Sequence, residues 1–526
     1  MREKWLLGAA VPVLALITFF YFPGHTILQS DTQIYLPILE HFWDPSVLAR
    51  DIVAINPHVA FTIYDEVAIA LRKVTGVGFE GVLMGQQFVY RALGILGLLL
   101  LGTGIGLSSR MAVLMAAMVS LGATIAGPAV LIVEYEPVPR GFALAFLLLA
   151  LGLVMHKRWT PAAAAAGMAF LFHPPTALAF YLVYAAAAVW RREYRAVAVL
   201  AGAAALMAVF AWTQAGISYH QDIFAQVDPV LEKLQRMRAS YNWISIWIAA
   251  WWKHYLLLWV ISLVAFFRLR RELPREMQVF CLALPLIGAL SPALSYLLLE
   301  DWKWSLMPQF QPGRYLLLVT FFAVLLAAVA GIRAVEMRRF VEGFLFFLVP
   351  FAVPTVSNLA QSVMVDRVLV ILLLAGVAVA AVWWPRLVAV AVAALLPFAL
   401  IPTLGKVRNY PAVHTVEMTQ LVEWARANTP NDAMFQFADA GQAQYPGVFR
   451  ARALRALYVD WKSGGQVNFL PAFANEWWRR WGLVEKVLPL SEYRALGIDF
   501  VVFQQVNKLK DVQPVYENGR YLVYRD

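Results

Sequence analysis

Acidic residues gather in one short stretch near the N-terminus, SDTQIYLPILEHFWDPSVLARD at positions 30–51. Its carboxylates belong to Asp31, Glu40, Asp44 and Asp51. A positioned carboxylate can act as a general base and remove a proton from an attacking hydroxyl group. Asp31 is the best candidate because its sequence neighbours are polar and uncharged, whereas Asp44 precedes a proline and is expected to cap a turn. The alternative is that these acids are ordinary solvated residues.

A second acidic motif, EYEPVPR, occupies residues 134–140. It offers the carboxylates of Glu134 and Glu136 and the guanidinium of Arg140, with Pro137 and Pro139 between them. Two prolines stiffen so short a connection because each fixes its own φ angle. We predict a rigid loop that presents these charges over a cavity. The alternative is a tight turn capped by charge.

Three further residues are candidates for substrate binding. His173 lies in the apolar motif FLFHPP, and Lys303 and Arg314 lie in EDWKWSLMPQFQPGRY. An ionisable residue inside an apolar region is a functional-site hypothesis, although a lone buried histidine is also common as a structural residue. A guanidinium suits phosphate oxygens, which favours a phosphate site. The alternative for the second motif is a belt of aromatic and basic residues at a membrane interface.

The composition indicates the class of protein in which these residues lie. The chain has 526 residues, of which 61% are hydrophobic and only 14% charged, and its mean hydropathy is +0.64. Average soluble domains carry about 25% charged residues. The net charge of +10 does not indicate nucleic-acid binding, because the basic residues form short clusters between apolar runs, which is the positive-inside pattern of membrane proteins. The single cysteine, Cys281, excludes a disulfide within the chain.

The apolar runs predict a polytopic helix bundle with about thirteen membrane spans. The expected spans are 5–22, 82–106, 111–133, 141–155, 160–173, 176–190, 196–215, 253–267, 278–298, 314–331, 341–357, 367–384 and 387–402. No small-residue cleavage site follows the first run, so we expect it to remain in the protein. The basic clusters place the N-terminus in the cytoplasm and the long loop 23–81 outside. Residues 160–190 are expected to form a shallow hairpin that turns at His173.

The last part of the chain, residues 403–526, has ordinary polarity and is predicted to form a small α/β domain outside the membrane, after a transmembrane domain at 1–402. VEMTQLVEWARAN has helical periodicity. AMFQFA, DFVVFQ, PVYEN and RYLVY are typical of short strands, and YENGRY predicts a hairpin. The predicted fold class is therefore mainly α, with a small extracytoplasmic α/β domain at the C-terminus.

This layout resembles the GT-C superfamily of membrane glycosyltransferases. The shared features are a cytoplasmic N-terminus, one span, a long acidic outer loop, about a dozen further spans and an outer C-terminal domain. The motif resemblance is limited to single positions: Asp31 in SDTQIY corresponds to the family's first-loop acid, and Glu134 and Glu136 to its second-loop acids. Paired first-loop acids and a WWDYG-type motif are absent, and the tail has VDWKSGG and NEWWRRW instead, which disfavours protein N-glycosylation.

The resemblance implies an inverting transfer of a sugar from a polyprenyl-phosphate donor to an acceptor hydroxyl outside the membrane. Asp31, Glu134 and Glu136 would be catalytic, and Arg140, His173, Lys303 and Arg314 would bind the substrate. A divalent cation, Mg²⁺ or Mn²⁺, would have Asp31 and Glu136 as oxygen ligands, but nothing in their spacing demands one. The expected location is a bacterial inner membrane, with membrane lipid and the lipid-linked donor as partners.

Two other functions stay open at this point. A transporter or flippase of a lipid-linked or polar substrate would share the spans and an intramembrane histidine, but the chain shows no inverted repeat. A non-catalytic scaffold of the same fold would bind sugars or a protein through the tail. The sequence contains no GxxxxGK[ST] phosphate loop, no GxSxG motif and no zinc-ligand spacing, so other familiar chemistries are disfavoured.

Overall fold

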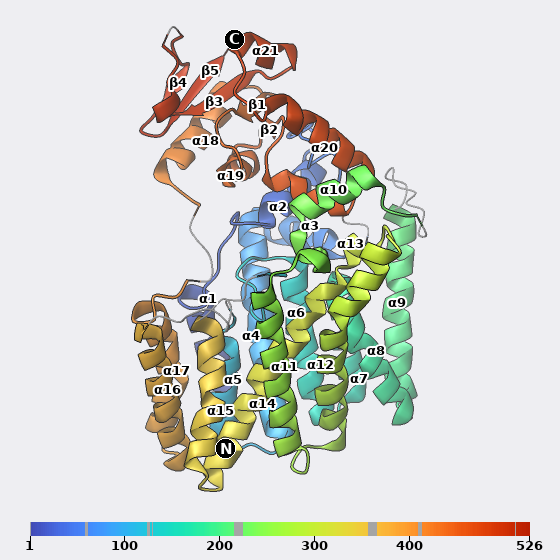
Figure 1. Ribbon diagram of the computed structural model, residues 1–526, viewed down its shortest axis with the longest axis vertical. Coiled ribbons are helices and arrows are strands. Elements are labelled where there is room, and N and C mark those ends of the chain that lie inside the picture. The colour runs from blue at the N-terminus through green and yellow to red at the C-terminus, as the bar shows by residue number, and fades with distance from the viewer. Residues whose placement is uncertain are drawn as a thin grey trace.

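The computed structural model describes residues 2–57, 61–123, 127–128, 130–214, 225–355, 365–408, 413–510 and 512–525. A long helical bundle forms one end of the molecule, and a small domain with a sheet forms the other (Figure 1). The apolar helices of the bundle are α1 (Arg2–Phe20), α4 (Phe79–Gly104), α5 (Ser109–Ser120), α6 (Pro139–Met155), α7 (Trp159–Phe172), α8 (Pro174–Trp190), α9 (Tyr194–Gln214), α11 (Ala249–Leu269), α12 (Arg275–Ser295), α14 (Leu316–Glu336), α15 (Phe340–Ala352), α16 (Val365–Trp383) and α17 (Leu387–Thr403).

Within the described ranges, the apolar helices follow the predicted order, and the protein is an integral membrane protein. Six of these helices are long and apolar enough to cross a membrane, and seven others are apolar but shorter. The predicted span 111–133 is the largest correction. Helix α5 ends at Ser120, and Gly122 follows with a left-handed φ of +79°, which L-residues with a side chain rarely adopt. The described residues 130–138 form no regular element, and the EYEPVPR motif runs from them into the first two residues of α6.

One end of the bundle collects the basic loops. Arg110 donates a hydrogen bond to the carbonyl oxygen of Pro385 at 2.5 Å, and Arg333 donates to the carbonyl oxygen of Gly106 at 2.9 Å, so loops far apart in sequence meet there. The N-terminus lies at this end and the C-terminal domain at the other (Figure 1). The positive-inside rule predicts that the basic end faces the cytoplasm.

Two glycines allow α4 and α6 to pack closely. A Cβ atom on Gly97 would lie 2.4 Å from the backbone of Leu148, and one on Gly152 would lie 2.4 Å from the carbonyl oxygen of Gly97. Small residues at such crossings let helix backbones approach in a membrane, where apolar burial alone does not drive association. Helix α14 is buried along nearly its whole length and forms the centre of the bundle. These contacts fix the helices from which the loops beneath the C-terminal domain emerge.

Short helices lie between the bundle and the C-terminal domain (Figure 1). They are α2 (Thr32–Trp43), α3 (Tyr64–Thr75), α10 (Pro229–Arg238) and α13 (Met307–Phe310). The short segments of 3-10 or π helix are η1 (Ser240–Asn242), η2 (Ile244–Ile246), η3 (Tyr296–Asp301), η4 (Pro312–Tyr315), η5 (Val353–Thr355), η6 (Lys462–Asn468) and η7 (Gln505–Asn507). Helices α2 and α3 belong to the long loop 23–81, where amphipathic surface helices are expected.

The C-terminal domain has a five-stranded sheet in the order β2-β1-β3-β5-β4. Its strands are β1 (Met434–Phe437), β2 (Ala456–Leu457), β3 (Phe500–Gln504), β4 (Tyr516–Glu517) and β5 (Tyr521–Arg525), and its helices are α18 (Val416–Asn428), α19 (Tyr445–Ala453), α20 (Pro471–Val484) and α21 (Leu490–Ala495). Strand β1 pairs in parallel with β2 and β3, and β5 pairs antiparallel with β3 and β4. The α/β character of the tail, its first helix and its hairpin are confirmed.

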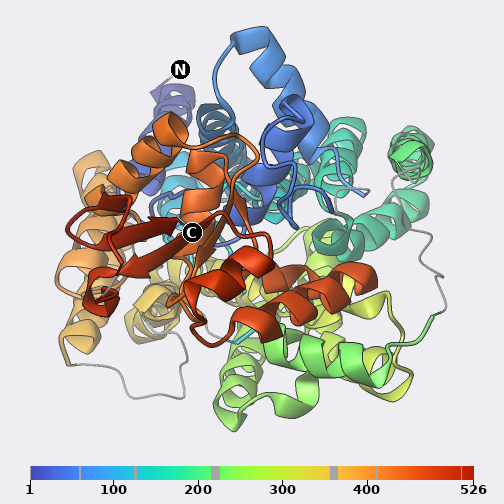
Figure 2. The same ribbon diagram turned by 90° about the horizontal axis from the view of Figure 1, so that it is seen from above.

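Seen from above, the C-terminal domain covers the middle of the bundle (Figure 2). It is held there by polar contacts with the long loop 23–81. The Arg450 and Asp460 side chains form a 2.8 Å ion pair and are 0% and 1% exposed, and Arg450 also donates to the carbonyl oxygen of Gln33 at 2.9 Å. Asp51 accepts a hydrogen bond from the backbone N–H of Leu457 at 3.0 Å. The domain is therefore docked directly above the start of α2.

Candidate functional site

Glu136 determines the path of the loop that leads into α2. Its Oε1 atom accepts hydrogen bonds from the backbone N–H groups of Gln29 and Ser30 and from the hydroxyl of Thr32, at 2.6–2.8 Å, and its Oε2 atom accepts from the backbone N–H of Asp31 at 2.8 Å. The side chain is buried, and burial raises the pKa of its carboxyl. Glu136 thereby fixes the backbone from which the Asp31 side chain projects.

The carboxylate of Asp31 lies between two cations. Its Oδ2 atom accepts from a guanidinium nitrogen of Arg140 at 2.6 Å, and its Oδ1 atom accepts from Nζ of Lys462 at 2.7 Å. Lys462 comes from the C-terminal domain. Burial raises the pKa of Asp31, but the nearby charges of Lys462 and Arg140 outweigh this effect and hold the pKa well below its usual range. Asp31 is therefore ionised at neutral pH.

Arg140 connects Asp31 to a second carboxylate. Its Nε and one terminal nitrogen contact the two oxygens of Glu134 at 2.5 and 3.3 Å, a forked geometry that restrains the guanidinium plane. Glu134, Arg140, Asp31 and Lys462 thus form a row of alternating charges. The structure brings together the predicted residues of the first and second outer loops, and it adds Lys462.

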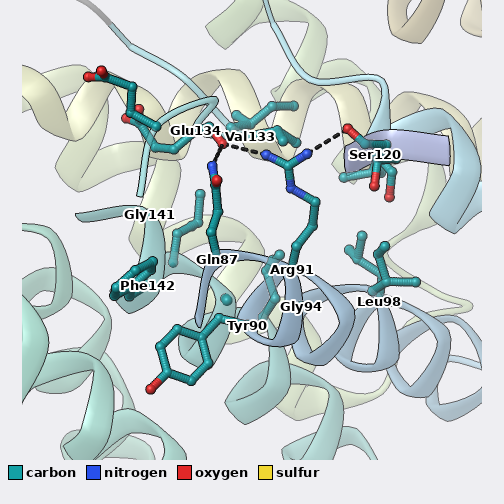
Figure 3. Close-up of a pocket in the computed structure, with 18 residues that line it drawn as sticks. Gln87, Tyr90, Arg91, Gly94, Leu98, Ser120, Val133, Glu134, Gly141 and Phe142 are labelled. Carbon is teal, nitrogen blue, oxygen red and sulfur yellow. Dashed lines mark hydrogen bonds between the residues drawn. The ribbon is translucent and has the colours of Figure 1, made fainter. Parts of the chain in front are cut away.

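Helix α4 supports this row from below. Arg91 donates to the carbonyl oxygen of Glu134 at 2.6 Å, and Gln87 donates to the same oxygen at 3.2 Å, as the dashed lines in Figure 3 show. Arg91 also donates to the carbonyl oxygens of Thr18 at 2.5 Å and Gly24 at 2.9 Å. One guanidinium inside the bundle therefore joins the end of α1 to both acidic loops.

A cavity with about 590 Å³ of empty space, part of it open to solvent, lies beside the row of charges. Three residues that the sequence predicted to bind the substrate line this cavity, each from a different segment of the chain. They are Arg140, His173 and Arg314. Glu134 also lines it. Because Arg140 touches both this cavity and Asp31, the Asp31 carboxylate is one residue away from the cavity wall.

Arg314 is a cation with no carboxylate partner in the part of the chain that the structure describes. Its guanidinium lies over the ring of Tyr241, 4.5 Å from the centroid, which is a cation–π contact. Its Nε atom is buried and has no hydrogen-bond partner within those residues. A buried donor without a partner is unfavourable, so an anionic ligand in the cavity would be stabilised here.

His173 has a local structural role as well as a place on the cavity wall. It is the N-cap of α8, and its Nδ1 atom accepts a hydrogen bond from the backbone N–H of Thr176 at 3.1 Å. This bond satisfies one of the free N–H groups at the start of a helix, and it leaves Nδ1 as the acceptor nitrogen. The predicted turn between the two apolar runs at His173 is confirmed.

Lys303 does not join the cluster, which corrects its predicted grouping with the other binding residues. Its Nζ atom forms an ion pair with Glu232 at 3.0 Å, and its side chain is 44% exposed. Asp44 is exposed and its Oδ1 atom accepts from the backbone N–H of Ser46 at 3.0 Å, so it stabilises a turn as expected. Asp51 is buried at the contact with the C-terminal domain.

The two carboxylates suggested as metal ligands do not fit a cation in this arrangement. The Glu136 oxygens accept hydrogen bonds from four donors, and the Asp31 oxygens are paired with Arg140 and Lys462. Divalent cations take oxygen ligands that are free to coordinate. Throughout the described ranges, no three His, Cys, Asp or Glu residues gather in a way that could hold a metal ion.

Two residues of the site were missed in the sequence. Arg91 lies inside the apolar helix α4, and a charged residue within a span is itself a functional signal, so the sequence did contain a sign of it. Lys462 lies in VDWKSGG, 431 residues after Asp31. Nothing in its local pattern distinguishes it from an ordinary surface lysine, because its partner comes from the other end of the chain.

Comparison with solved structures finds distant similarities over nearly the whole chain. The Archaeoglobus fulgidus oligosaccharyltransferase in its apo form is 11% identical, with a TM-score of 0.42, over 95% of this chain and 69% of that chain. ArnT from Cupriavidus metallidurans is 14% identical in both structures. The apo state has a TM-score of 0.47 over 99% of this chain and 97% of that one, and the form bound to undecaprenyl phosphate has 0.43 over 99% and 98%.

Sequence comparison finds a match over only part of the chain. No curated protein sequence matches the chain. One family model matches, a domain of unknown function (DUF6798), over residues 416–484. The matched segment includes α18, β1, α19, β2, η6 and α20. It therefore contains Lys462, which pairs with Asp31, and the buried Arg450, which donates to the carbonyl oxygen of Gln33.

Proposed function

We propose that this protein is a membrane glycosyltransferase. It transfers a sugar from a polyprenyl-phosphate donor to the hydroxyl group of an acceptor, with inversion at the anomeric carbon and with Asp31 as the general base. The reaction takes place at the end of the bundle that carries the C-terminal domain, which faces away from the cytoplasm in a bacterial inner membrane. The donor enters from the membrane, and membrane lipid surrounds the bundle.

One observation carries this proposal. Arg140 binds the Asp31 carboxylate at 2.6 Å and lines the same cavity as Arg314, which has no carboxylate partner among the described residues. A sugar phosphate in this cavity would have a cation at its phosphate and a fixed carboxylate near its sugar. Transfer of a glycosyl group requires these two groups, because one stabilises the leaving phosphate and the other activates the acceptor.

The bond changes follow from this arrangement. The acceptor oxygen attacks the anomeric carbon, the bond from that carbon to the phosphate oxygen breaks, and the phosphate leaves with the electron pair. Asp31 takes the proton of the acceptor hydroxyl. Arg314 and, through its contact with the cavity, Arg140 stabilise the charge that develops on the leaving phosphate. His173 forms part of the cavity wall, and Glu136 and Glu134 hold Asp31 and Arg140 in place.

The roles of the three acids therefore differ. Glu136 has four hydrogen-bond donors on its carboxylate and acts as a positioning residue. Glu134 restrains Arg140 through the forked contact. Asp31 is partly exposed, with 28% of its side-chain surface accessible, and a substrate can reach it. These differences favour Asp31 as the base over the two second-loop acids.

The test is a comparison of Asp31→Asn with Asp44→Asn in a deletion strain complemented with each variant. Both are acids of the first outer loop, but Asp44 is exposed and only stabilises a turn. The glycolipids and glycans of the cell envelope are compared by mass spectrometry at matched protein levels. We expect Asp31→Asn to lower transfer about 100- to 10,000-fold, the usual contribution of a positioned base, while Asp44→Asn stays near wild type. Near wild-type transfer by a well-expressed Asp31→Asn protein would overturn the proposal.

A further inference from the structure

Among the described residues, Lys462 is the charged residue of the C-terminal domain that contacts Asp31. It is the first residue of η6, and its Nζ atom donates to Asp31 at 2.7 Å and to the hydroxyl of Ser30 at 2.9 Å. Its side chain is 13% exposed. Asp31 is its only carboxylate partner among those residues, whereas Arg140 is also held by Glu134.

The rest of η6 and the residue after it contact residues that adjoin the cavity wall. Asn468, the last residue of η6, donates to the hydroxyl of Tyr241 at 3.4 Å, and the Tyr241 ring carries the guanidinium of Arg314. The next residue, Phe469, accepts a hydrogen bond from Gln309 at 3.1 Å through its carbonyl oxygen. One short helix of the C-terminal domain thus contacts Asp31 at its start and the support of Arg314 at its end.

The pair between Lys462 and Asp31 opposes the reaction as it stands. A carboxylate that binds two cations is a weak base, because both cations favour its ionised form. Arg140 cannot leave easily, since its guanidinium is restrained by Glu134 on the other side. A lysine ammonium is a compact charge on a flexible stem, so Lys462 can change partners while its backbone stays in η6.

We propose that Lys462 exchanges partners when the substrate binds. In the empty site it neutralises Asp31, and in the occupied site it binds the phosphate group of the substrate and leaves Asp31 free to accept a proton. The C-terminal domain is then a part of the phosphate site. This exchange rests on the proposed glycosyl transfer for its purpose, but it is a property of anion binding and can be measured without any transfer.

The test measures anion affinity by calorimetry on the purified full-length protein in detergent. The two probes are inorganic phosphate and farnesyl phosphate, a short soluble polyprenyl monophosphate. The variants are Lys462→Met and Asp31→Asn. The control is Lys508→Met, because Lys508 lies in the same domain and forms a similar lysine–carboxylate pair with Glu517 at 2.8 Å, but on the exposed surface.

The exchange predicts that the two site variants shift the anion affinity in opposite directions. Lys462→Met removes a charge-assisted contact to the anion and is expected to weaken binding about ten- to a hundredfold. Asp31→Asn removes the competing partner of Lys462 and is expected to tighten binding several-fold. Lys508→Met should leave the affinity unchanged. If Lys462 only braces the C-terminal domain, both site variants will bind the anion as wild type does, and this result would overturn the exchange.

Two further outcomes are informative. If Lys462→Met unfolds at a lower temperature than wild type, the Asp31→Asn variant alone decides the test, because it retains Lys462. Tighter anion binding by Asp31→Asn supports the exchange, and equal or weaker binding overturns it. A Lys462-dependent response to inorganic phosphate identifies a headgroup site that needs no lipid, and a response to farnesyl phosphate alone identifies a lipid-borne phosphate. Either response supports the exchange, and a protein that shows it without transferring sugar would contradict only the proposed reaction.

Discussion

The Oε2 atom of Glu136 and the backbone nitrogen of Asp31 are 2.8 Å apart, although 105 residues separate them in the chain. A carboxylate and a main-chain N–H group in this position hold the first residue of the site by its backbone rather than by its side chain. The Asp31 side chain stays available to Arg140, to Lys462 and to a substrate. The position of the Asp31 backbone therefore depends on the buried carboxylate of Glu136.

Replacing Glu136 by glutamine should loosen this loop. The amide nitrogen of glutamine cannot accept from an N–H group, so at least one buried donor loses its partner, which costs about 1–3 kcal/mol. We expect a lower unfolding temperature for Glu136→Gln in a tryptophan-fluorescence melt of the full-length protein. Glu80→Gln is the matched control, because Glu80 forms a partly exposed pair with Arg452. Equal melting of the two variants would show that Glu136 does not hold the loop.

The buried acid at the start of α3 should make stability depend on pH. Burial, followed by the charge of Glu66, raises the pKa of Asp65 to about 8, while an unfolded aspartate has a pKa near 3.9. The folded state therefore retains a proton that the unfolded state releases, and stability is lost as the pH rises from about 4 through about 8. Melting temperatures between pH 5 and 9 should fall for wild type and change less for Asp65→Asn. Parallel curves would contradict this assignment.

The contact between α4 and α6 should tolerate no side chain at Gly97. A methyl group there would meet the backbone of Leu148 at 2.4 Å, and overpacking of this kind costs about 1–3 kcal/mol. Gly85 is the internal control, because it lies on the same helix and a Cβ atom there would meet nothing within 4 Å. Thermal unfolding should show Gly97→Ala below wild type and Gly85→Ala at or slightly above it. The reverse order would mean that α4 and α6 are not packed through Gly97.

Arg314 should account for part of the affinity for the donor phosphate. Loss of one or two charge-assisted hydrogen bonds in Arg314→Ala is expected to weaken binding of a polyprenyl phosphate, each bond contributing about 1.5–3 kcal/mol. Arg314→Lys should recover only part, since an ammonium cannot bind two oxygens in the forked geometry. Equilibrium binding to each variant measures this. An unchanged affinity in Arg314→Ala would leave its cation–π contact with Tyr241 as its role.

The orientation in the membrane can be tested with reporter fusions. A reporter that is active only outside the cytoplasm should work after Asp526, and one that is active only in the cytoplasm should work near Arg192 or Arg270. The reason is the collection of basic loops at one end of the bundle and the C-terminal domain at the other. Cytoplasmic activity of the fusion at Asp526 would place the cluster around Asp31 on the wrong side for an outer acceptor.

Local patterns explain what could be predicted from the sequence. Apolar runs and basic clusters are repeated signals, so the order of the helices and the α/β tail followed from them. Asp31, Glu134 and Arg140 could be named because they border apolar runs, where charge is unusual. The early end of α5 was missed because Gly122 lies in a run that is otherwise apolar and looks continuous. Lys303 was grouped with Arg314 by proximity in sequence, but its ion pair with Glu232 directs it elsewhere.

Contacts between distant segments could not be predicted in the same way. Lys462 meets Asp31, and Arg450 meets the carbonyl oxygen of Gln33, across more than 400 residues. A polar residue in a soluble-looking tail carries no sign of which loop it will contact. The amino-acid sequence therefore shows which residues could do chemistry, but not which of them the fold will bring together.

The ion pair between Asp31 and Lys462 also sets an order in time. Asp31 leaves the ribosome early in translation, and Lys462 follows only after the last apolar helix, α17, has been made. The ion pair therefore forms late, after the C-terminal domain has been made and has docked above the start of α2. A chain that stops before Lys462 would contain every apolar helix of the bundle and still lack this partner of Asp31, so completion of the ion pair depends on synthesis of the C-terminal domain.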